Sequence, residues 1–248
     1  MARHFFCPVP LAARPAHTRA MTAPPLDRKA ALMAMLAEIE LDLDYDAIDT
    51  SSFEPDLQGW GDQDPIFDYV VRHFHPVVIL ELGSWKGASA IRMADLLRDY
   101  NIPGLVLCID TWLGSNESLW RVAANRQMLR LRNGYPDMFG QFIRNIQHSG
   151  HQQRIRHLPM TTGCAAGLLA AYNIVPDAIY IDAGHDEAEV AADIAGFWPL
   201  LKPGGIMFGD DYTTEWPGTV RAVNRFVADQ GLKLMGTEVK WLVRKPEA

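Results

Sequence analysis

The sequence has few of the features expected of a disulfide-rich, membrane-spanning or nucleic-acid-binding protein. Its three cysteines, Cys7, Cys108 and Cys164, form no CxxC pair and no zinc-type spacing. We therefore expect free thiols in a reducing compartment, and a cytoplasmic protein. No apolar run reaches the ~18 residues of a membrane span. A net charge of −7 argues against a nucleic acid or an anionic membrane as partner.

Acidic residues are absent from residues 1–25, which are rich in proline and alanine. This stretch also lacks the continuous apolar segment of a secretion signal. We expect residues 1–25 to be a disordered tail, and residues 26–76 to be a helical N-terminal flank or lid. Apolar residues at helical spacing predict helices over Leu26–Leu43 and Pro65–Phe74 in this flank.

Regular alternation of apolar strands and helices begins at Val77 and continues along the rest of the chain. The expected strands are Val77–Glu81, Leu105–Ile109, Ile155–Leu158, Ala178–Ile181 and Ile206–Phe208, followed by the short pair Leu232–Met235 and Lys240–Val243. One of the intervening helices is expected over Glu117–Leu131. Such alternation predicts an α/β fold with a mostly parallel sheet and helices on both faces. An apolar content of 48% is sufficient for its core.

A glycine-bearing turn, Glu81-Leu-Gly-Ser-Trp-Lys-Gly, lies between the first strand and its helix. Gly83 allows a positive φ and close approach of a ligand, and Gly87 allows the helix start to pack closely. The G-x-x-x-G pattern differs from the dinucleotide fingerprint G-x-G-x-x-G. Asp110 ends the second strand, where an acid can accept hydrogen bonds from the hydroxyls of a ribose.

Two neighbouring strands are also expected to end in acids. Asp182 follows one strand, and the pair Asp210–Asp211 follows the next. Carboxylates that converge at one edge of a sheet repel one another unless a cation lies between them. Oxygen ligands, with no cysteine nearby and His185 as the only close imidazole, favour Mg²⁺ over zinc.

Together these features resemble the class I S-adenosylmethionine-dependent methyltransferases. The resemblance covers residues 77–248, which we expect to form the methyltransferase domain, with a seven-stranded Rossmann-like sheet and an antiparallel strand pair at the C-terminus. It implies that the methyl donor binds at a set of nine residues: Glu81, Gly83, Ser84, Gly87, Ser89, Asp110, Trp112, Thr161 and Asp182. Other interpretations are a surface acid for Glu81, a helix cap for Asp110, and core packing for Trp112 and Thr161.

The phrases Tyr-Ile-Asp-Ala-Gly-His, Leu-Lys-Pro-Gly-Gly and Gly-Asp-Asp-Tyr are similar to those of metal-dependent O-methyltransferases, of the macrocin and mycinamicin group and the catechol type. This resemblance implies Mg²⁺ held by Asp182, Asp210 and Asp211. We expect His185 to be the general base, with helix capping or support of Asp182 as its alternative roles. Some relatives use an acid two residues after the first metal ligand as base, but here that position is Gly184.

The expected function is transfer of a methyl group from S-adenosylmethionine to a hydroxyl of a small sugar-like or catechol-like molecule. Alternatives are a metal-independent methyltransferase, an NAD(P)-dependent oxidoreductase and a non-catalytic methyltransferase-like binding module. The helical flank could also pair subunits into a homo-oligomer, as related sugar methyltransferases assemble. We expect the acceptor pocket to draw on the segments Trp112–Trp120, Asn133–Phe139, Tyr212–Trp216 and Phe53–Gly61. His148, His151 and His157 are interpreted as surface residues.

Overall fold

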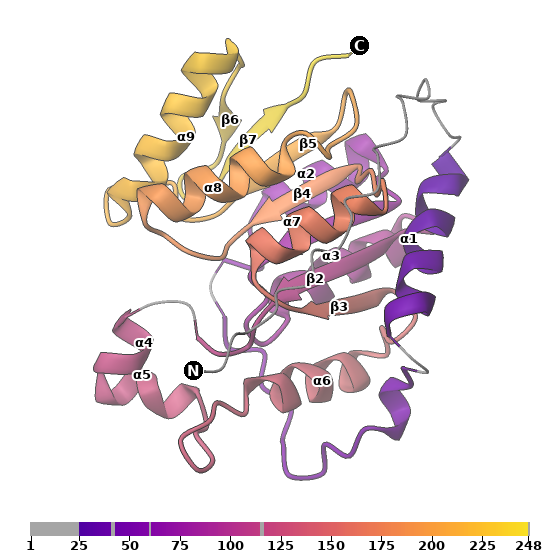
Figure 1. Ribbon diagram of the computed structural model, residues 1–248, viewed down its shortest axis with the longest axis vertical. Coiled ribbons are helices and arrows are strands. Elements are labelled where there is room, and N and C mark those ends of the chain that lie inside the picture. Colours follow the sequence, from indigo (N-terminus) through magenta and orange to yellow (C-terminus); the bar gives the residue numbers. More distant parts are fainter. Residues whose placement is uncertain (1–24, 41–42, 60, 115–116, 248) are drawn as a thin grey trace, which may run out of the picture.

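One seven-stranded sheet forms the centre of the molecule (Figure 1). This computed structural model describes residues 25–247, except 41–42, 60 and 115–116. The strands are β1 Val78–Leu82, β2 Leu105–Asp110, β3 Ile155–Pro159, β4 Ala178–Ile181, β5 Ile206–Gly209, β6 Met235–Gly236 and β7 Trp241–Arg244. They lie in the order β3-β2-β1-β4-β5-β7-β6.

The first five strands of the chain are parallel, and the last two introduce the antiparallel pairing. Strand β1 lies between β2 and β4, and β5 pairs in parallel with β4. Strand β7 runs antiparallel to both β5 and β6. The predicted Rossmann-like fold class, with its antiparallel C-terminal pair, is confirmed.

Helices cover both faces of the sheet (Figure 1). They are α1 Pro25–Ile39, α2 Pro65–Phe74, α3 Ala88–Asp99, α4 Glu117–Arg121, α5 Ala123–Met128, α6 Met138–Ser149, α7 Thr162–Ala171, α8 Glu187–Phe197 and α9 Pro217–Gln230, with the 3₁₀ turn η1 Tyr45–Ala47. Alternate residues of each strand point to opposite faces. One face packs with α2, α3 and α6, and the other with α1, α7, α8 and α9.

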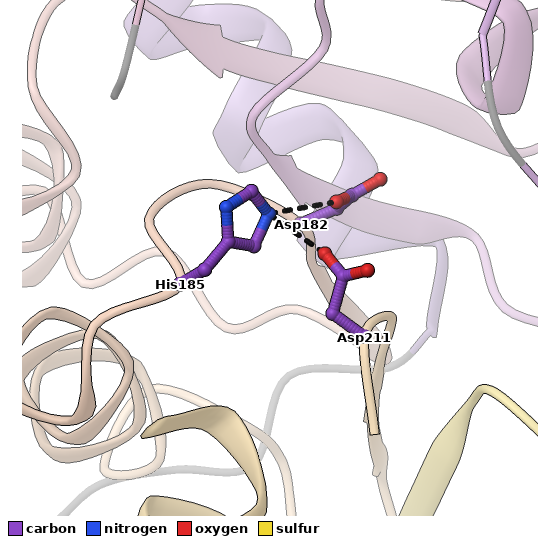
Figure 2. Close-up of side chains that lie close together, drawn as sticks. All are labelled: Asp182, His185 and Asp211. Carbon is purple, nitrogen blue, oxygen red and sulfur yellow. Dashed lines mark ion pairs between the residues drawn. The ribbon is translucent and has the colours of Figure 1, made fainter. Parts of the chain in front are cut away.

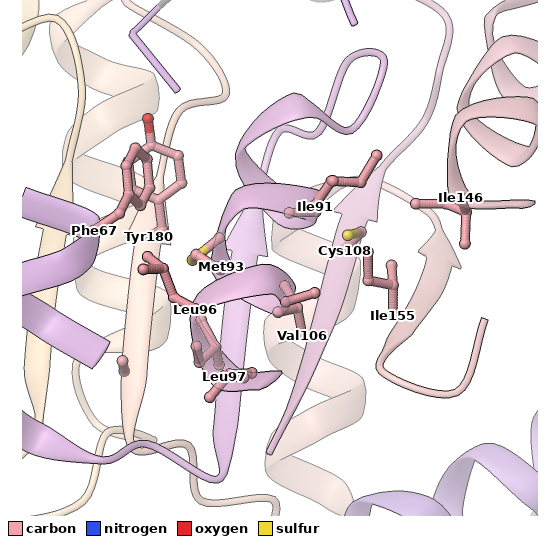
Figure 3. Close-up of a cluster of buried hydrophobic side chains, with 14 of the residues drawn as sticks. Phe67, Ile91, Met93, Leu96, Leu97, Val106, Cys108, Ile146, Ile155 and Tyr180 are labelled. Carbon is pink, nitrogen blue, oxygen red and sulfur yellow. The ribbon is translucent and has the colours of Figure 1, made fainter. Parts of the chain in front are cut away.

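The core on the α2 and α3 side consists of aromatic rings and branched aliphatic side chains (Figure 3). Phe67 of α2 meets the ring of Tyr180 of β4 edge-on, with ring centroids 5.0 Å apart. Leu97 of α3 and Cys108 of β2 are also fully buried there. Burial of one such side chain contributes about 1.5–3 kcal/mol, so this face holds α2 and α3 firmly on the sheet.

The first helix, α1, packs against one face of the sheet. Leu32 and Leu36 of α1 are fully buried in the second core. Arg28 reaches the buried carboxylate of Asp177 at 2.6 Å, and Lys202 approaches the same oxygen at 2.6 Å. Residues 1–24 of the predicted tail lie outside the described part of the chain, and Pro25 begins α1. Among the described helices, none is both long and apolar enough to cross a membrane.

Two predictions about local structure are wrong. The single helix expected over Glu117–Leu131 is divided into α4 and α5, because Val122 between them has an extended backbone. Helix α5 buries no residue, so tertiary packing does not favour one long helix here. Two of the three histidines interpreted as surface residues are also not exposed. His151 is buried beside Asp95, and His157 lies among aromatic rings.

Candidate active site at the strand ends

The turn after β1 brings its backbone into contact with the end of β4. Gly83 has a φ of +82°, and a Cβ there would overlap the carbonyl oxygen of Asp182. The Gly83 amide donates to the carbonyl of Ile109 at 2.9 Å, which ties the turn to β2 as well. Only glycine can take this conformation and this close approach without strain. The ends of β1, β2 and β4 are therefore joined at one point.

Glu81 lies beneath this turn and holds it in place. Its two carboxylate oxygens accept hydrogen bonds from the hydroxyls of Ser84, at 2.5 Å, and Ser89, at 2.6 Å. Burial raises the pKa of Glu81 to about 7, although these two hydrogen bonds oppose the shift. Because Glu81 lines neither of the two cavities described below, its contacts support the loop from behind. The surface position considered for Glu81 is wrong, because the residue is fully buried.

Asp110, at the end of β2, organises the same turn from the other side. One of its oxygens accepts the backbone amides of Ser84 at 2.8 Å and Trp85 at 3.0 Å. The other accepts the amide of Trp112 at 2.7 Å. A carboxylate offers about four lone-pair sites, so Asp110 keeps acceptor capacity toward the cavity that it lines.

A first cavity of about 430 Å³ opens above the ends of β1, β2 and β4. Of the nine residues predicted to bind the donor, five line it: Gly83, Asp110, Trp112, Thr161 and Asp182. The ring of Trp112 is 3% exposed and packs on Phe142, so most of this side chain serves the core. The sequence did not single out three further lining residues, Met160, Glu189 and Asp193. Glu189 and Asp193 lie one helical turn apart on α8, a spacing that is common in any amphipathic helix.

A second cavity of about 420 Å³ lies beside the first and shares Gly83, Trp85, Asp182 and Ala183 with it. The predicted residues Ser84, Ser89, His185, Asp210 and Asp211 line it as well. Three of the four segments expected around an acceptor contribute, through Gly59, Leu119, Glu215 and Trp216. The segment Asn133–Phe139 does not contribute to this cavity, although its Met138 reaches the first. Gly87 lies at the start of α3, where a Cβ would be 3.0 Å from the ring of Phe142.

Three side chains converge at the floor of the second cavity (Figure 2). The Nε2 atom of His185 lies 2.7 Å from an oxygen of Asp211 and 4.0 Å from an oxygen of Asp182. One potential ligand atom from each of these residues lies within 4.8 Å of the other two, close enough for a metal ion. Trp216 covers the imidazole ring, with ring centroids 4.3 Å apart.

Asp210, the remaining predicted metal ligand, is held by other partners. Its Oδ2 atom forms an ion pair with Lys240, whose side chain is fully buried. Tyr180 lies between the acids, its hydroxyl 3.2 Å from oxygens of both Asp182 and Asp210. The sequence analysis singled out neither Lys240 nor Tyr180. Both residues lie in apolar segments expected to be strands, and nothing in the sequence indicated that they contact Asp210.

The acids at this edge and His185 change one another's pKa values. Burial, with the charges of Asp210 and Asp211, raises the pKa of Asp182 to about 6, although His185 opposes the shift. Burial opposes a charge on His185, but contacts with Asp182 and Asp211 raise its pKa to about 10. The negative charges at this edge disfavour ionisation of Asp182 and favour protonation of His185. A positive charge between Asp182 and Asp211 therefore stabilises this edge of the sheet.

Residues 80–212, more than half of the chain, match a family described as a methyltransferase domain. The chain belongs to this methyltransferase family. The matched range begins within β1 and ends just after the strand-end acids, so it contains both cavities' central residues. A comparison with curated protein sequences finds no match.

Solved structures of methyltransferases share the fold of this methyltransferase domain. The O-methyltransferase NovP superposes with a TM-score of 0.57 at 16% identity, over 90% of this chain and 99% of NovP. The calicheamicin methyltransferase CalS11 gives 0.55 at 18% identity, over 94% and 99%. An O-methyltransferase from Bacillus cereus, in complex with SAH, gives 0.54 at 16% identity, over 87% and 97%. At these identities the similarity establishes the fold.

Proposed function

We propose that this methyltransferase transfers a methyl group from S-adenosylmethionine to a hydroxyl group of a small molecule. The observation that carries the proposal is that two cavities share Gly83 and Asp182, at the carboxyl ends of β1 and β4. Open α/β sheets bind ligands at this edge. One cavity suits the nucleoside part of the donor and the other suits an acceptor. The structural neighbours NovP and the Bacillus cereus enzyme are O-methyltransferases, which supports the same chemistry.

In the reaction, the acceptor oxygen forms a bond to the methyl carbon, and the bond from that carbon to sulfur breaks. The sulfonium group of the donor supplies a good leaving group, so the protein's main tasks are alignment and removal of the hydroxyl proton. Ser84, in the turn after β1, and Ser89, in the first turn of α3, line the second cavity and are proposed to lie near the methionine part of the donor. Asp110 faces the first cavity and is proposed to accept hydrogen bonds from the ribose.

The strand-end residues fit a divalent cation. Asp182 and Asp211 supply carboxylate oxygens and His185 an imidazole nitrogen. Burial, with repulsion from Asp210 and Asp211, raises the pKa of Asp182, and a positive charge there offsets both effects. From sequence the ion is predicted to be Mg²⁺, held by Asp182, Asp210 and Asp211. A bound divalent cation would lower the pKa of a nearby acceptor hydroxyl. The role of His185 as general base stays a prediction of the sequence.

The acceptor proposed is neutral, with two neighbouring oxygens, as in a sugar diol or a catechol. Among the described residues that line the second cavity there is no lysine or arginine, while four acids are present: Asp182, Asp210, Asp211 and Glu215. The neighbour CalS11 is a TDP-rhamnose 3'-O-methyltransferase. The acidic lining here does not favour a phosphate-bearing acceptor. Trp85 and Trp216 offer flat apolar faces for a ring.

The first experiment is isothermal titration of the full chain with S-adenosylhomocysteine and, separately, with NADH. We expect binding of S-adenosylhomocysteine alone. Binding of NADH alone would replace the proposal with an oxidoreductase function.

The second experiment measures release of S-adenosylhomocysteine from S-adenosylmethionine in the presence of catechols and neutral sugars, with and without EDTA. Asp211→Asn should lower turnover at least tenfold. Asp229→Asn, the same chemical change on the exposed side of α9, is the matched control. Donor binding without turnover on any acceptor would favour a binding module. Turnover that is unaffected by EDTA would remove the metal and leave a metal-independent methyltransferase.

Residues 77–248 are proposed as the catalytic domain and residues 26–76 as its flank. Within that flank, the segment 53–59 is fastened to the domain. Lys86, which is 5% exposed, contacts Asp56 at 2.6 Å. Asn145 of α6 accepts the Asp56 amide at 2.9 Å. Gly59, at the end of this segment, lines the second cavity, which supports the proposal that the flank acts as a lid.

A further inference from the structure

We propose that the cation site of this protein is formed by Asp182, His185 and Asp211, and that Lys240 permanently withholds Asp210 from it. The inference rests on the proposed function, because it specifies the donor set of the same site. It replaces one predicted carboxylate with an imidazole. The consequence is a site that selects a first-row transition ion such as Mn²⁺, Co²⁺ or Zn²⁺ by its nitrogen donor.

Both carboxylate oxygens of Asp210 have partners within the protein. Its Oδ2 atom pairs with the Lys240 ammonium and accepts from the Tyr180 hydroxyl at 3.2 Å. Its Oδ1 atom accepts the backbone amide of Asp211 at 2.8 Å. To bind a metal ion through Oδ2, Asp210 would have to leave Lys240, and a buried ammonium without its partner is strongly destabilising.

The ammonium group of Lys240 is enclosed by its neighbours. Its ammonium lies 5.3 Å from the ring centroids of both Phe67 and Tyr180, and 3.0 Å from the Tyr180 hydroxyl. Gly61 closes the space above it, since a Cβ on Gly61 would lie 2.9 Å from the Lys240 nitrogen. The side chain is fully buried. The ion pair is therefore a fixed part of the core beneath the cavity.

His185 is held with its Nε2 atom directed at the two remaining acids. The ring of Trp216 packs against the imidazole at a tilt of 32°, with 4.3 Å between ring centroids. The start of α9 packs against the backbone of His185, because a Cβ on Gly218 would lie 2.6 Å from the His185 carbonyl oxygen. The distances from Nε2 to the acids, 2.7 and 4.0 Å, bracket the spacing of adjacent ligands around one ion. In this arrangement His185 binds the cation and does not act as the free base expected from sequence.

Two carboxylates and one imidazole form a donor set different from the all-oxygen set preferred by Mg²⁺. Imidazole binds first-row transition ions, and affinity rises from Mn²⁺ through Co²⁺. Any site with both oxygen and nitrogen ligands binds these transition ions more tightly than Mg²⁺. A comparison of the affinities of the wild-type protein for different ions therefore does not identify the ligands. The diagnostic property is which substitutions change the binding of which ion.

The test uses the full chain stripped of metal, titrated with Co²⁺, Mn²⁺ and Mg²⁺ by calorimetry, with the visible spectrum of Co²⁺ as a second readout. Asp182→Asn and Asp211→Asn should weaken all three ions at least tenfold. His185→Gln should weaken Co²⁺ at least tenfold, change its spectrum, and affect Mg²⁺ much less. Asp210→Asn should change every affinity by less than about threefold.

Asp210→Asn leaves the Lys240 ammonium buried without its partner, so the double variant Asp210→Asn/Lys240→Met serves where the single variant fails to fold. Loss of Co²⁺ binding in this folded double variant, to the extent seen in Asp211→Asn, would overturn the inference. An unchanged Co²⁺ spectrum in His185→Gln would overturn it as well. Titration with S-adenosylhomocysteine accompanies each variant. A wild-type protein that binds this probe and no cation would refute the metal site while leaving the proposed donor site intact.

Discussion

Gly83 and Asp182 are in direct backbone contact, and no side chain fits between them. A Cβ on Gly83 would overlap the Asp182 carbonyl oxygen and lie 2.6 Å from its carbonyl carbon. The two residues end adjacent strands, since the Asp182 amide donates to the carbonyl of Leu82 at 2.8 Å. Both line both cavities. The spacing between the expected donor and the strand-end acids is therefore set by the backbone.

Gly83→Ala should abolish donor binding and lower the free energy of unfolding by more than 3 kcal/mol, or prevent folding. The substitution adds an overlap with backbone to the cost of a left-handed residue, which alone is about 1–2 kcal/mol. Gly134→Ala separates the two effects, because Gly134 has a φ of +81° and open space around it. Urea denaturation and titration with S-adenosylhomocysteine measure both. Equal losses in the two variants would contradict the role of close contact.

Asp177→Asn should lower the free energy of unfolding by about 2–3 kcal/mol in urea denaturation, because it leaves two cations without their buried partner. The Asp177 side chain is 2% exposed and contacts Arg28 of α1 and Lys202. It also accepts the amides of Val77 and Val78 at 3.0 and 2.9 Å. The control is Arg225→Ala, which breaks an exposed ion pair with Glu187 and should cost less than about 1 kcal/mol. A similar cost for both would show that Asp177 does not secure α1.

His157 should make the protein less stable as the pH falls from about 6.5 to 4. Burial, with the charge of Arg156, lowers its pKa to about 4. Between these pH values the unfolded chain binds a proton at this site and the folded chain does not. The free energy of unfolding therefore decreases as the pH is lowered, by up to about 3 kcal/mol. His157→Gln does not titrate and can keep the contact with the Tyr45 hydroxyl, which lies 2.7 Å from Nδ1. Urea denaturation of both proteins across this range should give a shallower dependence for the variant, and parallel curves would refute the assignment.

Asn145→Ala should loosen the contact of Asp56 with α6, while Gln141 of α6 still donates to the Glu54 carbonyl at 2.8 Å. The Asn145 amide group donates to the carbonyls of Asp56 and Lys86, both at 2.8 Å, and its oxygen accepts the Asp56 amide. Hydrogen exchange at the Asp56 amide should become at least tenfold faster, because its acceptor is lost. Asn224→Ala, on the exposed face of α9, is the control. Unchanged exchange in Asn145→Ala would mean that other contacts, such as those of Lys86 with Asp56 and of Gln141 with Glu54, hold the segment.

Residues in strands and turns were predicted more accurately than residues joined by long-range contacts. The apolar run Ala178–Ile181 predicted β4 with its observed bounds. Gly83 correctly indicated the turn that lines both cavities. The long helix over Glu117–Leu131 was wrong, because continuing it past Val122 would require burial that the fold does not provide. His157 was wrongly placed on the surface, because its partner Tyr45 comes from a remote part of the chain.

The alternating fold, the glycine turn and the acids at neighbouring strand ends are predictable from the sequence, because they depend on local periodicity and on the order of residues at strand ends. The partners of those acids depend on long-range packing. Lys240, which directly precedes β7, forms an ion pair with Asp210, and His185 forms one with Asp211. Such pairings depend on strand order and on the space left by residues such as Gly61. Neither is encoded in the spacing of the acids along the chain.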